Sequence, residues 1–408
     1  MVWGLKGSRR APRPAAQYPT PYQLPGFRDQ GDRSETPFRC EDEVVKHTRG
    51  RVVTVTSVEE LDARLADTST RLTGWRIVGV DLRERSGRLR ERDTSRTTFA
   101  GCVFAPDDAA LHAARGALVL PDVSTTPVDI RRQSLYTAAE LFDAHHYEDS
   151  VDARAYSWQN RRREPDDLLA RALHDEAIDS ALSDWTAERR IAGVMGGHSL
   201  ARGDAGYAEA AGLGRLLATG QRDGGITVAT GGGPGAMEAA NLGARLARHP
   251  ESALDDALRE LARVPSFHPS VDAWLEPALE IVATLPDPVD SLGIPTWHYG
   301  HEPPSPFPTA IAKYFRNALR ESILLEIADA GIVFLPGAAG TVQEIFQDAC
   351  ENYYATDDAI APMVLVGREY WTQTLPAWPL LRALARGRAM EPHVHLVDTV
   401  GEAAALLT

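Results

Sequence analysis

The sequence predicts an α/β protein with a doubly wound parallel sheet in its C-terminal half and a smaller α/β unit before it. From about residue 190 onward, short apolar runs alternate with helical patterns, which is typical of a parallel sheet covered by helices on both faces. Three of these apolar runs end in glycine-rich turns. A separate alternation of short strand and helix patterns fills residues 51–120.

The overall composition argues against two classes of partner. The net charge of −14 disfavours nucleic-acid binding, because non-specific affinity depends on neutralising phosphates. No apolar run approaches the ~18 residues of a membrane-spanning helix, and the N-terminus has no apolar signal core. Cys40, Cys102 and Cys350 are widely spaced and odd in number, which predicts reduced thiols and no zinc framework. We therefore expect a cytoplasmic protein with no nucleic-acid or membrane partner.

The patterns divide the 408 residues into four segments. Residues 1–40 are rich in Pro, Arg, Gln and Gly with little periodicity, which predicts an irregular arm. A small α/β domain of unknown role is expected at 41–150, a polar helical bridge at 151–189, and the larger sheet at 190–408. Within the small domain we expect strands at 52–55, 75–82, 99–104 and 117–120, helices at 58–65 and 107–114, and a solvated charged loop at 83–96.

The second half continues the alternation, with a helix expected at 204–219. The interval 250–288 is long for a connection and contains two helical patterns, 253–263 and 271–282. It therefore predicts an inserted lid or a subunit contact. The chain is expected to close with strands at 363–366 and 394–397 and a helix at 401–407.

Residues 309–329 predict one helix, because apolar residues recur every four positions from Ile311 to Ile327. Lys313, Arg316 and Arg320 then share another face of that helix. A solvated basic face is the common interpretation of such a pattern. That interpretation is weaker here because the helix leads directly into a strand that ends in a glycine turn.

The most informative stretch runs from Gly331 to Glu344. A wholly apolar run predicts a buried parallel strand, Pro336 and Gly337 a turn, and Thr341 the start of a helix. A strand, glycine turn and helix start aim backbone N–H groups and the positive helix end at a phosphate. Glu344 is expected one turn inside that helix. The pattern suits a small phosphorylated substrate that reacts near its phosphate, although an ordinary tight connection would use the same residues.

Two further strand patterns, 191–195 and 226–229, also lead into glycine turns. The crevice of a doubly wound sheet lies at the carboxyl ends of its strands. We therefore expect the three turns to converge on one crevice of a Rossmann-like sheet, bringing together Gly196, Gly233, Gly337 and Gly340. None of the turns fits G-x-G-x-x-G followed by an acidic residue at the end of the next strand, so a dinucleotide site is not favoured.

Taken in order, three motifs resemble the LOG family: Gly-Gly-His-Ser at 196–199, Gly-Gly-Gly-Pro-Gly-Ala-Met-Glu at 231–238, and Pro-Gly-Ala-Ala-Gly-Thr-Val-Gln-Glu at 336–344. That family comprises phosphoribohydrolases, once labelled lysine decarboxylases, with the motif Pro-Gly-Gly-x-Gly-Thr-x-x-Glu. The long Gly-Pro-Gly-Ala-Met form and the stretch 292–304 are most similar to its nucleotide 5′-monophosphate nucleosidases. The resemblance covers the chain from residue 190 to residue 400, and Ala338 stands where the motif has its second glycine.

The resemblance implies hydrolysis of the N-glycosidic bond of a nucleoside 5′-monophosphate, such as AMP, to free base and ribose 5-phosphate. The transition state is oxocarbenium-like, so a carboxylate held against the ribose stabilises the developing charge and orients water. Glu344 is the first candidate for that carboxylate, and Arg320 matches the family's active-site arginine. Glu302 and Glu238 are candidates for a second carboxylate. A loop-to-helix cap and a helix N-terminal charge are equally good interpretations of these two residues.

The resemblance also implies how the protein binds and assembles. No metal or cofactor is required, and we expect a homodimer or larger assembly with the site near the subunit contact. The residues expected to bind the nucleotide lie in the three turns and their helix starts: Gly196, Gly197, Ser199, Gly232, Gly233, Gly235, Glu238, Gly337, Gly340 and Thr341.

Two other functions stay open. A nucleotide-sensing module would keep the phosphate cradle without turnover, which Ala338 would allow. A pyridoxal-phosphate decarboxylase would need a Schiff-base lysine. Lys313 is the single lysine in the second half of the chain, and its place on the helix before the motif argues against that role.

Overall fold

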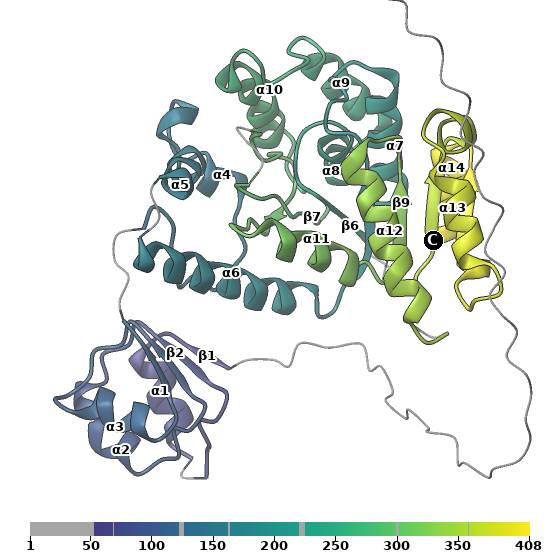
Figure 1. Cartoon of the computed structure of the whole chain (residues 1–408). Helices are drawn as coiled ribbons and strands as arrows, with labels where there is room; N and C mark the ends of the chain where they lie inside the picture. The colour runs from purple at the N-terminus through teal and green to yellow at the C-terminus, as the bar shows by residue number, and fades with distance from the viewer. Residues whose placement is uncertain are drawn as a thin grey trace, which may run out of the picture. The chain divides into compact units, whose positions relative to one another are not determined.

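The computed structural model describes residues 53–67, 69–121, 126–161, 164–219, 225–298, 302–357 and 359–408 (Figure 1). The arm expected at 1–40 lies outside these residues. Among the described helices, none is both long and apolar enough to cross a membrane.

A seven-stranded parallel sheet organises the second half of the chain. Its strands lie in the order β11-β10-β9-β5-β6-β7-β8, and every neighbouring pair is parallel. This confirms the predicted Rossmann-like fold. The strands are β5 (Arg190–Met195), β6 (Ile226–Thr230), β7 (Ser291–Gly293), β8 (Ala310–Ile311), β9 (Gly331–Phe334), β10 (Met363–Val366) and β11 (Val394–Val397).

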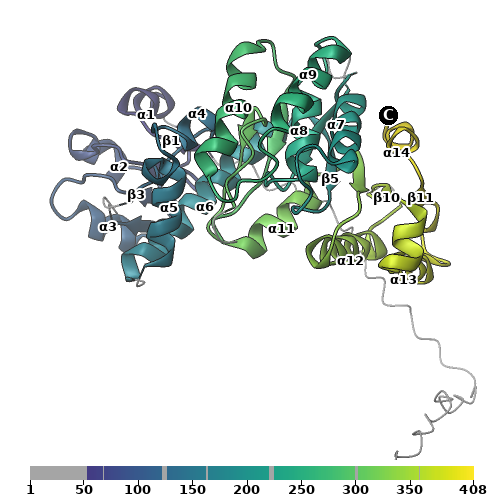
Figure 2. The same cartoon turned by 90° about the horizontal axis from the view of Figure 1, so that it is seen from above.

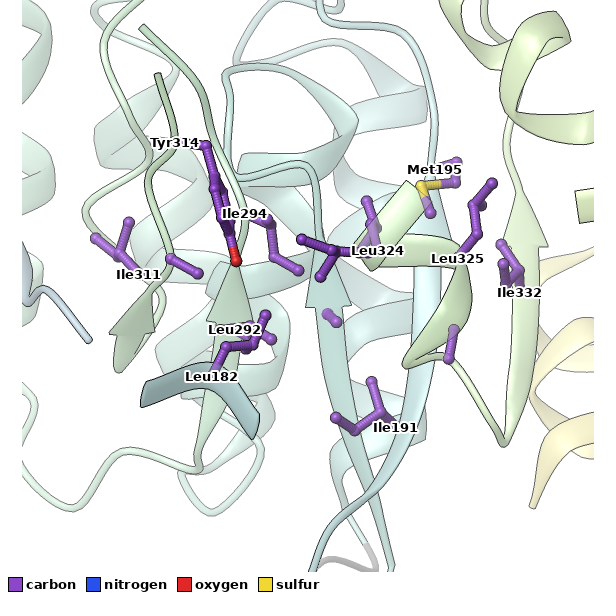
Figure 3. Packing of buried hydrophobic residues seen from close by; sticks show 14 of the residues in the cluster. Leu182, Ile191, Met195, Leu292, Ile294, Ile311, Tyr314, Leu324, Leu325 and Ile332 are labelled. Carbon is purple, nitrogen blue, oxygen red and sulfur yellow. The ribbon is translucent and has the colours of Figure 1, made fainter. Parts of the chain in front are cut away.

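Side chains of the strands enter two hydrophobic clusters, one on each face of the sheet. Ile191 and Met195 of β5 belong to the same cluster as Leu292 and Ile332, part of which is drawn in Figure 3. Val194, also in β5, belongs to the other cluster. Because both faces are buried, these strands appear in the sequence as continuous apolar runs without alternation.

Helices cover both faces of this sheet, as Figure 2 shows. Those on one face are α7 (Ala205–Ala218), α8 (Ala236–Arg245) and α14 (Val400–Leu407), together with the inserted α9 (Glu251–Leu261) and α10 (Val271–Thr284). Those on the other face are α11 (Asn317–Glu326), α12 (Ala339–Tyr354) and α13 (Ala377–Ala385).

The order of the strands reverses beside β5. From β5 the chain proceeds outward through β6, β7 and β8, and then returns to add β9 on the other side of β5. The pairing of Met195 with Phe334 brings the carboxyl ends of β5 and β9 level with each other. Ligands of open α/β sheets bind in the crevice at such a reversal. The turns after β5 and β9 therefore mark the place where a site is expected.

The small N-terminal unit has a four-stranded parallel sheet of its own, in the order β1-β2-β3-β4. Its core includes Val55, Leu61, Ile77 and Phe99. The charged loop expected at 83–96 contains helical turns instead, because Leu89 is buried in this core. Its elements are β1 (Thr54–Val55), α1 (Val58–Leu65), β2 (Arg76–Val78), α2 (Ser86–Arg90), β3 (Thr98–Ala100), α3 (Asp108–Ala114) and β4 (Leu118–Leu120).

The segment expected as a helical bridge belongs to the larger core. After the short α4 (Ala138–Leu141), α5 (Val151–Asn160) and α6 (Pro165–Thr186) contribute Trp158 and Leu182 to the hydrophobic cluster that contains β7. These helices therefore pack with the sheet and do more than connect two domains.

The prediction of a single helix over 309–329 is wrong in its first half. Residues 310–311 form β8, and α11 begins only at Asn317. The reason is a contact from far away in the sequence: the Asp175 carboxylate accepts the backbone N–H groups of Phe315 and Arg316 at 2.9 and 3.0 Å. Lys313, Arg316 and Arg320 therefore do not share a helix face.

Candidate functional site

A cleft of about 680 Å³ lies at the carboxyl ends of β5, β6 and β9. Its size is within the range of small-molecule sites, which is about 300–1,000 Å³. All three glycine turns contribute to it, as the sequence predicts. Most of the predicted site residues line it: Gly196, Gly197, Ser199, Gly233, Glu302, Arg320, Gly337, Gly340, Thr341 and Glu344.

The turn after β9 leads into α12 without a side-chain cap. Ala338 is the N-cap residue, and it has no side-chain oxygen to accept the first N–H groups of the helix. Val342 donates the first hydrogen bond of the helix, to the carbonyl of Ala338. In the described part of the chain, the N–H groups of Ala339, Gly340 and Thr341 show no acceptor. The positive end of α12 therefore presents free donors to the cleft, as anion sites do.

The fold requires glycine at one of the two glycine positions of this turn and not at the other. A Cβ at Gly337 would collide with the hydroxyl of Thr341, so the turn itself requires glycine there. A Cβ at Gly340 would meet no atom within 4 Å, so the fold makes no such demand at that position. Between them, Ala338 has a φ of −103°, outside the left-handed region. The sign of φ therefore does not require glycine at this position.

Arg320 is held in place by backbone carbonyls. Its Nε atom donates to the carbonyl of Ile294 at 2.7 Å, and its Nη2 atom donates to the carbonyl of Gly231 at 3.3 Å. These two residues follow β7 and β6, so the guanidinium lies at the carboxyl edge of the sheet. The side chain is only 10% exposed, and its Nη1 atom lies 3.6 Å from Glu344 Oε1.

Glu344 places its carboxyl group beside this cation, and its side chain is 15% exposed. Burial raises its pKa to about 6, against the opposing influence of Arg320, and the nearby carboxylate of Glu321 adds to the increase. A carboxyl group with this pKa is mostly ionised at neutral pH and can still accept and return a proton. Glu344 belongs to α12, so one helix carries both the free N–H donors and the carboxylate.

Glu302 lines the cleft beside the turn that follows β6. A Cβ added to Gly233 would lie 3.9 Å from Glu302 Oε2. His198, from the turn after β5, places its Nε2 atom 4.0 Å from Glu302 Oε1. The two side chains are 63% and 33% exposed for the histidine and the glutamate, respectively. This pair therefore forms a more solvent-accessible part of the cleft than Glu344 does.

Gly232, Gly235 and Glu238 do not line the cleft. The two glycines have positive φ values of 67° and 76°, which the turn requires. Glu238 forms an ion pair with Arg202 in which both side chains are 1% exposed. Arg202 also donates to the carbonyl of Trp274, in α10, at 2.7 Å. The charge of Glu238 is thus occupied in joining the inserted helices to α8, and it is not open to a substrate.

Tyr370 and Glu321 also line the cleft, and neither is among the residues predicted from the sequence. The Tyr370 hydroxyl donates to the carbonyl of Gly337 at 2.7 Å, and the Gln343 amide donates to Glu321 at 2.7 Å. Tyr370 follows β10 closely, so the rule that parallel strands end at one edge could have found it. Glu321 is the sequence neighbour of Arg320, and no motif or spacing in the sequence predicts that it lines the site.

Lys313 lies outside the cleft. Its side chain is 1% exposed, and its Nζ atom lies 2.5 Å from Asp152 Oδ1. The indole N–H of Trp297 donates to the same carboxylate oxygen at 2.8 Å. This lysine is therefore occupied in a buried polar cluster and does not reach the cleft where a Schiff base would have to form. Among the described residues, no group of three or more His, Cys, Asp or Glu side chains could hold a metal ion.

No protein-family model matches the chain, and no curated protein matches it significantly in sequence. Among solved structures, it is similar to the molybdenum cofactor carrier protein of Chlamydomonas reinhardtii. The two share 18% sequence identity, the match covers 53% of this chain and 94% of that one, and the TM-score is 0.32. At this level the likeness carries no inference about ligand or activity.

Proposed function

We propose that the protein hydrolyses the N-glycosidic bond of nucleoside 5′-monophosphates, releasing the free base and ribose 5-phosphate. The observation that carries the proposal is the position of Glu344. This half-buried carboxylate lies 3.6 Å from Arg320, on the helix whose uncapped N-terminus faces the same cleft. An anion site and a carboxylate on one helix suit a substrate in which a ribose joins the phosphate to the reacting carbon. The resemblance to the LOG family supports the same reaction.

The phosphate is assigned to the free N–H groups at the start of α12. The cleft is lined by the carboxylates of Glu302, Glu321 and Glu344, so no broad cationic field attracts an anion. Local donors must therefore hold it: the N–H groups at the helix end and the N–H groups of Arg320 that backbone carbonyls do not occupy. Binding energy gained at the phosphate, away from the reacting bond, positions the ribose against Glu344.

Glu344 is assigned two tasks in the reaction. The bond between ribose C1′ and the base nitrogen breaks, its electrons leave with the base, and positive charge develops on the ribose. The ionised carboxylate stabilises that charge and accepts a proton from the water whose oxygen bonds to C1′. The proton then passes to the base nitrogen, so the carboxylate is regenerated. Glu302 is the remaining candidate for a second carboxylate, because Glu238 is occupied by Arg202.

The experiment that tests this proposal is incubation of the native protein with each common nucleoside 5′-monophosphate, followed by chromatography of the released bases. We expect free base from at least one of them and none from the corresponding nucleosides, because nucleosides lack the phosphate that positions the ribose. Nucleotide binding without base release from any monophosphate would favour the sensing module instead. Ala338→Gly would then be the substitution to try for restoring turnover. The homodimer or larger assembly stays a prediction.

A further inference from the structure

One residue of the cleft has no part in the reaction proposed above. Tyr370 begins a π-helical segment, Tyr370–Thr374, shortly after β10, and the N–H of Leu375 bonds back to the Tyr370 carbonyl at 2.8 Å. Trp371, its neighbour, is fully buried and fixes the segment to the core. Single turns of π-helix are often found at functional sites. The Tyr370 hydroxyl donates to the carbonyl of Gly337, in the turn that follows the adjacent strand β9.

This hydrogen bond determines which way one peptide group of the turn points. The carbonyl of Gly337 and the N–H of Ala338 belong to the same planar trans peptide, so they point in opposite directions. A tyrosine bound to the carbonyl therefore directs the N–H to the other side. Gly337 has no side chain to resist rotation of that peptide. In a rotated peptide the carbonyl oxygen would take the place of the N–H group, and an oxygen repels an anion where an N–H group attracts it.

We propose that Tyr370 is a positioning residue for phosphate recognition: its hydroxyl holds the Gly337–Ala338 peptide so that the N–H joins the donors at the start of α12. The ligand class is a phosphate monoester, such as ribose 5-phosphate. This inference rests on the proposed function, because it concerns the same site. The inference assigns a role to Tyr370, which contacts the turn after β9 and not the reacting atoms.

The test is Tyr370→Phe, which removes the hydroxyl alone. Binding of ribose 5-phosphate, measured by calorimetry, should weaken by about tenfold, the equivalent of one hydrogen bond. The KM for a nucleoside monophosphate should rise by a similar factor while kcat changes little. Tyr353→Phe is the matched control, because that hydroxyl bonds Arg388 outside the cleft. It should bind ribose 5-phosphate as the native protein does.

A general loss of structure in Tyr370→Phe would weaken the binding of free base as much as that of ribose 5-phosphate, and this outcome would overturn the inference. Equal affinity of variant and native protein for ribose 5-phosphate would overturn it as well, even if base release were normal. If the native protein releases no base but ribose 5-phosphate binding still depends on Tyr370, the proposed reaction fails and this inference stands. If the native protein does not bind ribose 5-phosphate, both fail.

Discussion

Arg320 Nη1 lies 3.6 Å from Glu344 Oε1, beyond hydrogen-bond distance, while two other N–H groups of Arg320 are bound to backbone carbonyls. The sheet edge, and not the carboxylate, therefore orients the guanidinium. The fold itself thus sets the arginine and the carboxylate beside each other, an arrangement that would stabilise developing charge with little reorganisation.

Glu344→Gln should make the protein more stable at neutral pH. Burial raises the pKa of Glu344 from 4.5 to about 6, so the fold favours the protonated form. This stabilisation is present below pH ~4.5 and is lost as the pH rises through about 6, a change of about 2 kcal/mol. Glutamine has no charge to bury. We expect the variant to exceed the native free energy of unfolding by about 1–2 kcal/mol at pH ~7.5 and not at pH ~4.5.

Urea denaturation at the two pH values measures this difference. Glu209→Gln, which changes an exposed carboxylate of α7, is the matched control and should alter neither value. If Glu344→Gln stabilised the protein equally at both pH values, ionisation of Glu344 could not be the cause.

Gly337→Ala should lower the stability of the fold, whereas Gly340→Ala should weaken phosphate binding without loss of stability. The first places a methyl group against the Thr341 hydroxyl and should destabilise the fold by about 1–3 kcal/mol. The second enters open space in the first turn of α12, so stability should hold or rise by up to about 1 kcal/mol. Its affinity for ribose 5-phosphate should nevertheless fall by about tenfold, as for one lost hydrogen bond. Unchanged affinity in Gly340→Ala would mean that phosphate does not approach this position.

The convergence of the glycine turns could be predicted from the sequence, because parallel strands with both faces buried leave continuous apolar runs and end at one edge. The resemblance to the LOG family predicts Arg320 in the site, whereas the single helix predicted over 309–329 is one that the structure does not have. An extended stretch buried on both sides gives Ile311 and Phe315 the same spacing as a helical stripe. The helix start depends on Asp175, and no local pattern indicates a contact so distant in the sequence.

The role of Glu238 could not be predicted for a related reason. A carboxylate in the first turn of a helix after a glycine turn is a reasonable ligand contact. Its actual partner, Arg202, comes from the loop before α7, and nothing in either local sequence indicates that the two meet. The Tyr370 contact is likewise set by the neighbouring positions of β9 and β10 in the sheet.

Glu238→Ala should reduce stability and leave nucleotide affinity intact. It leaves the Arg202 guanidinium buried without a counter-charge, which costs about 3–5 kcal/mol for a broken buried pair. Glu260→Ala, which breaks an exposed pair with Arg263, should cost at most about 0.5 kcal/mol. Urea denaturation and nucleotide calorimetry measure the two properties. Weaker nucleotide binding with native stability would instead indicate that Glu238 contacts the substrate.

Lys313→Met combined with Asp152→Asn should leave base release close to native, because the pair lies outside the cleft. Lys313→Met alone isolates the buried Asp152 carboxylate and should cost about 3–5 kcal/mol of stability. Base release is measured in both variants after circular dichroism has established that they are folded. A folded double variant that releases no base would support a catalytic lysine after all.

The proposed reaction is tested most directly by measuring free base and ribose 5-phosphate together, in native protein and in Glu344→Gln. We expect the native protein to release the two products in equal amounts from a nucleoside 5′-monophosphate. Glu344→Gln should lose turnover by ~10² or more while nucleotide binding is largely kept, because the amide preserves shape and hydrogen bonding but not charge. Native turnover in Glu344→Gln, or a native protein that binds the nucleotide and releases no base, would contradict the assignment of Glu344 as the catalytic carboxylate.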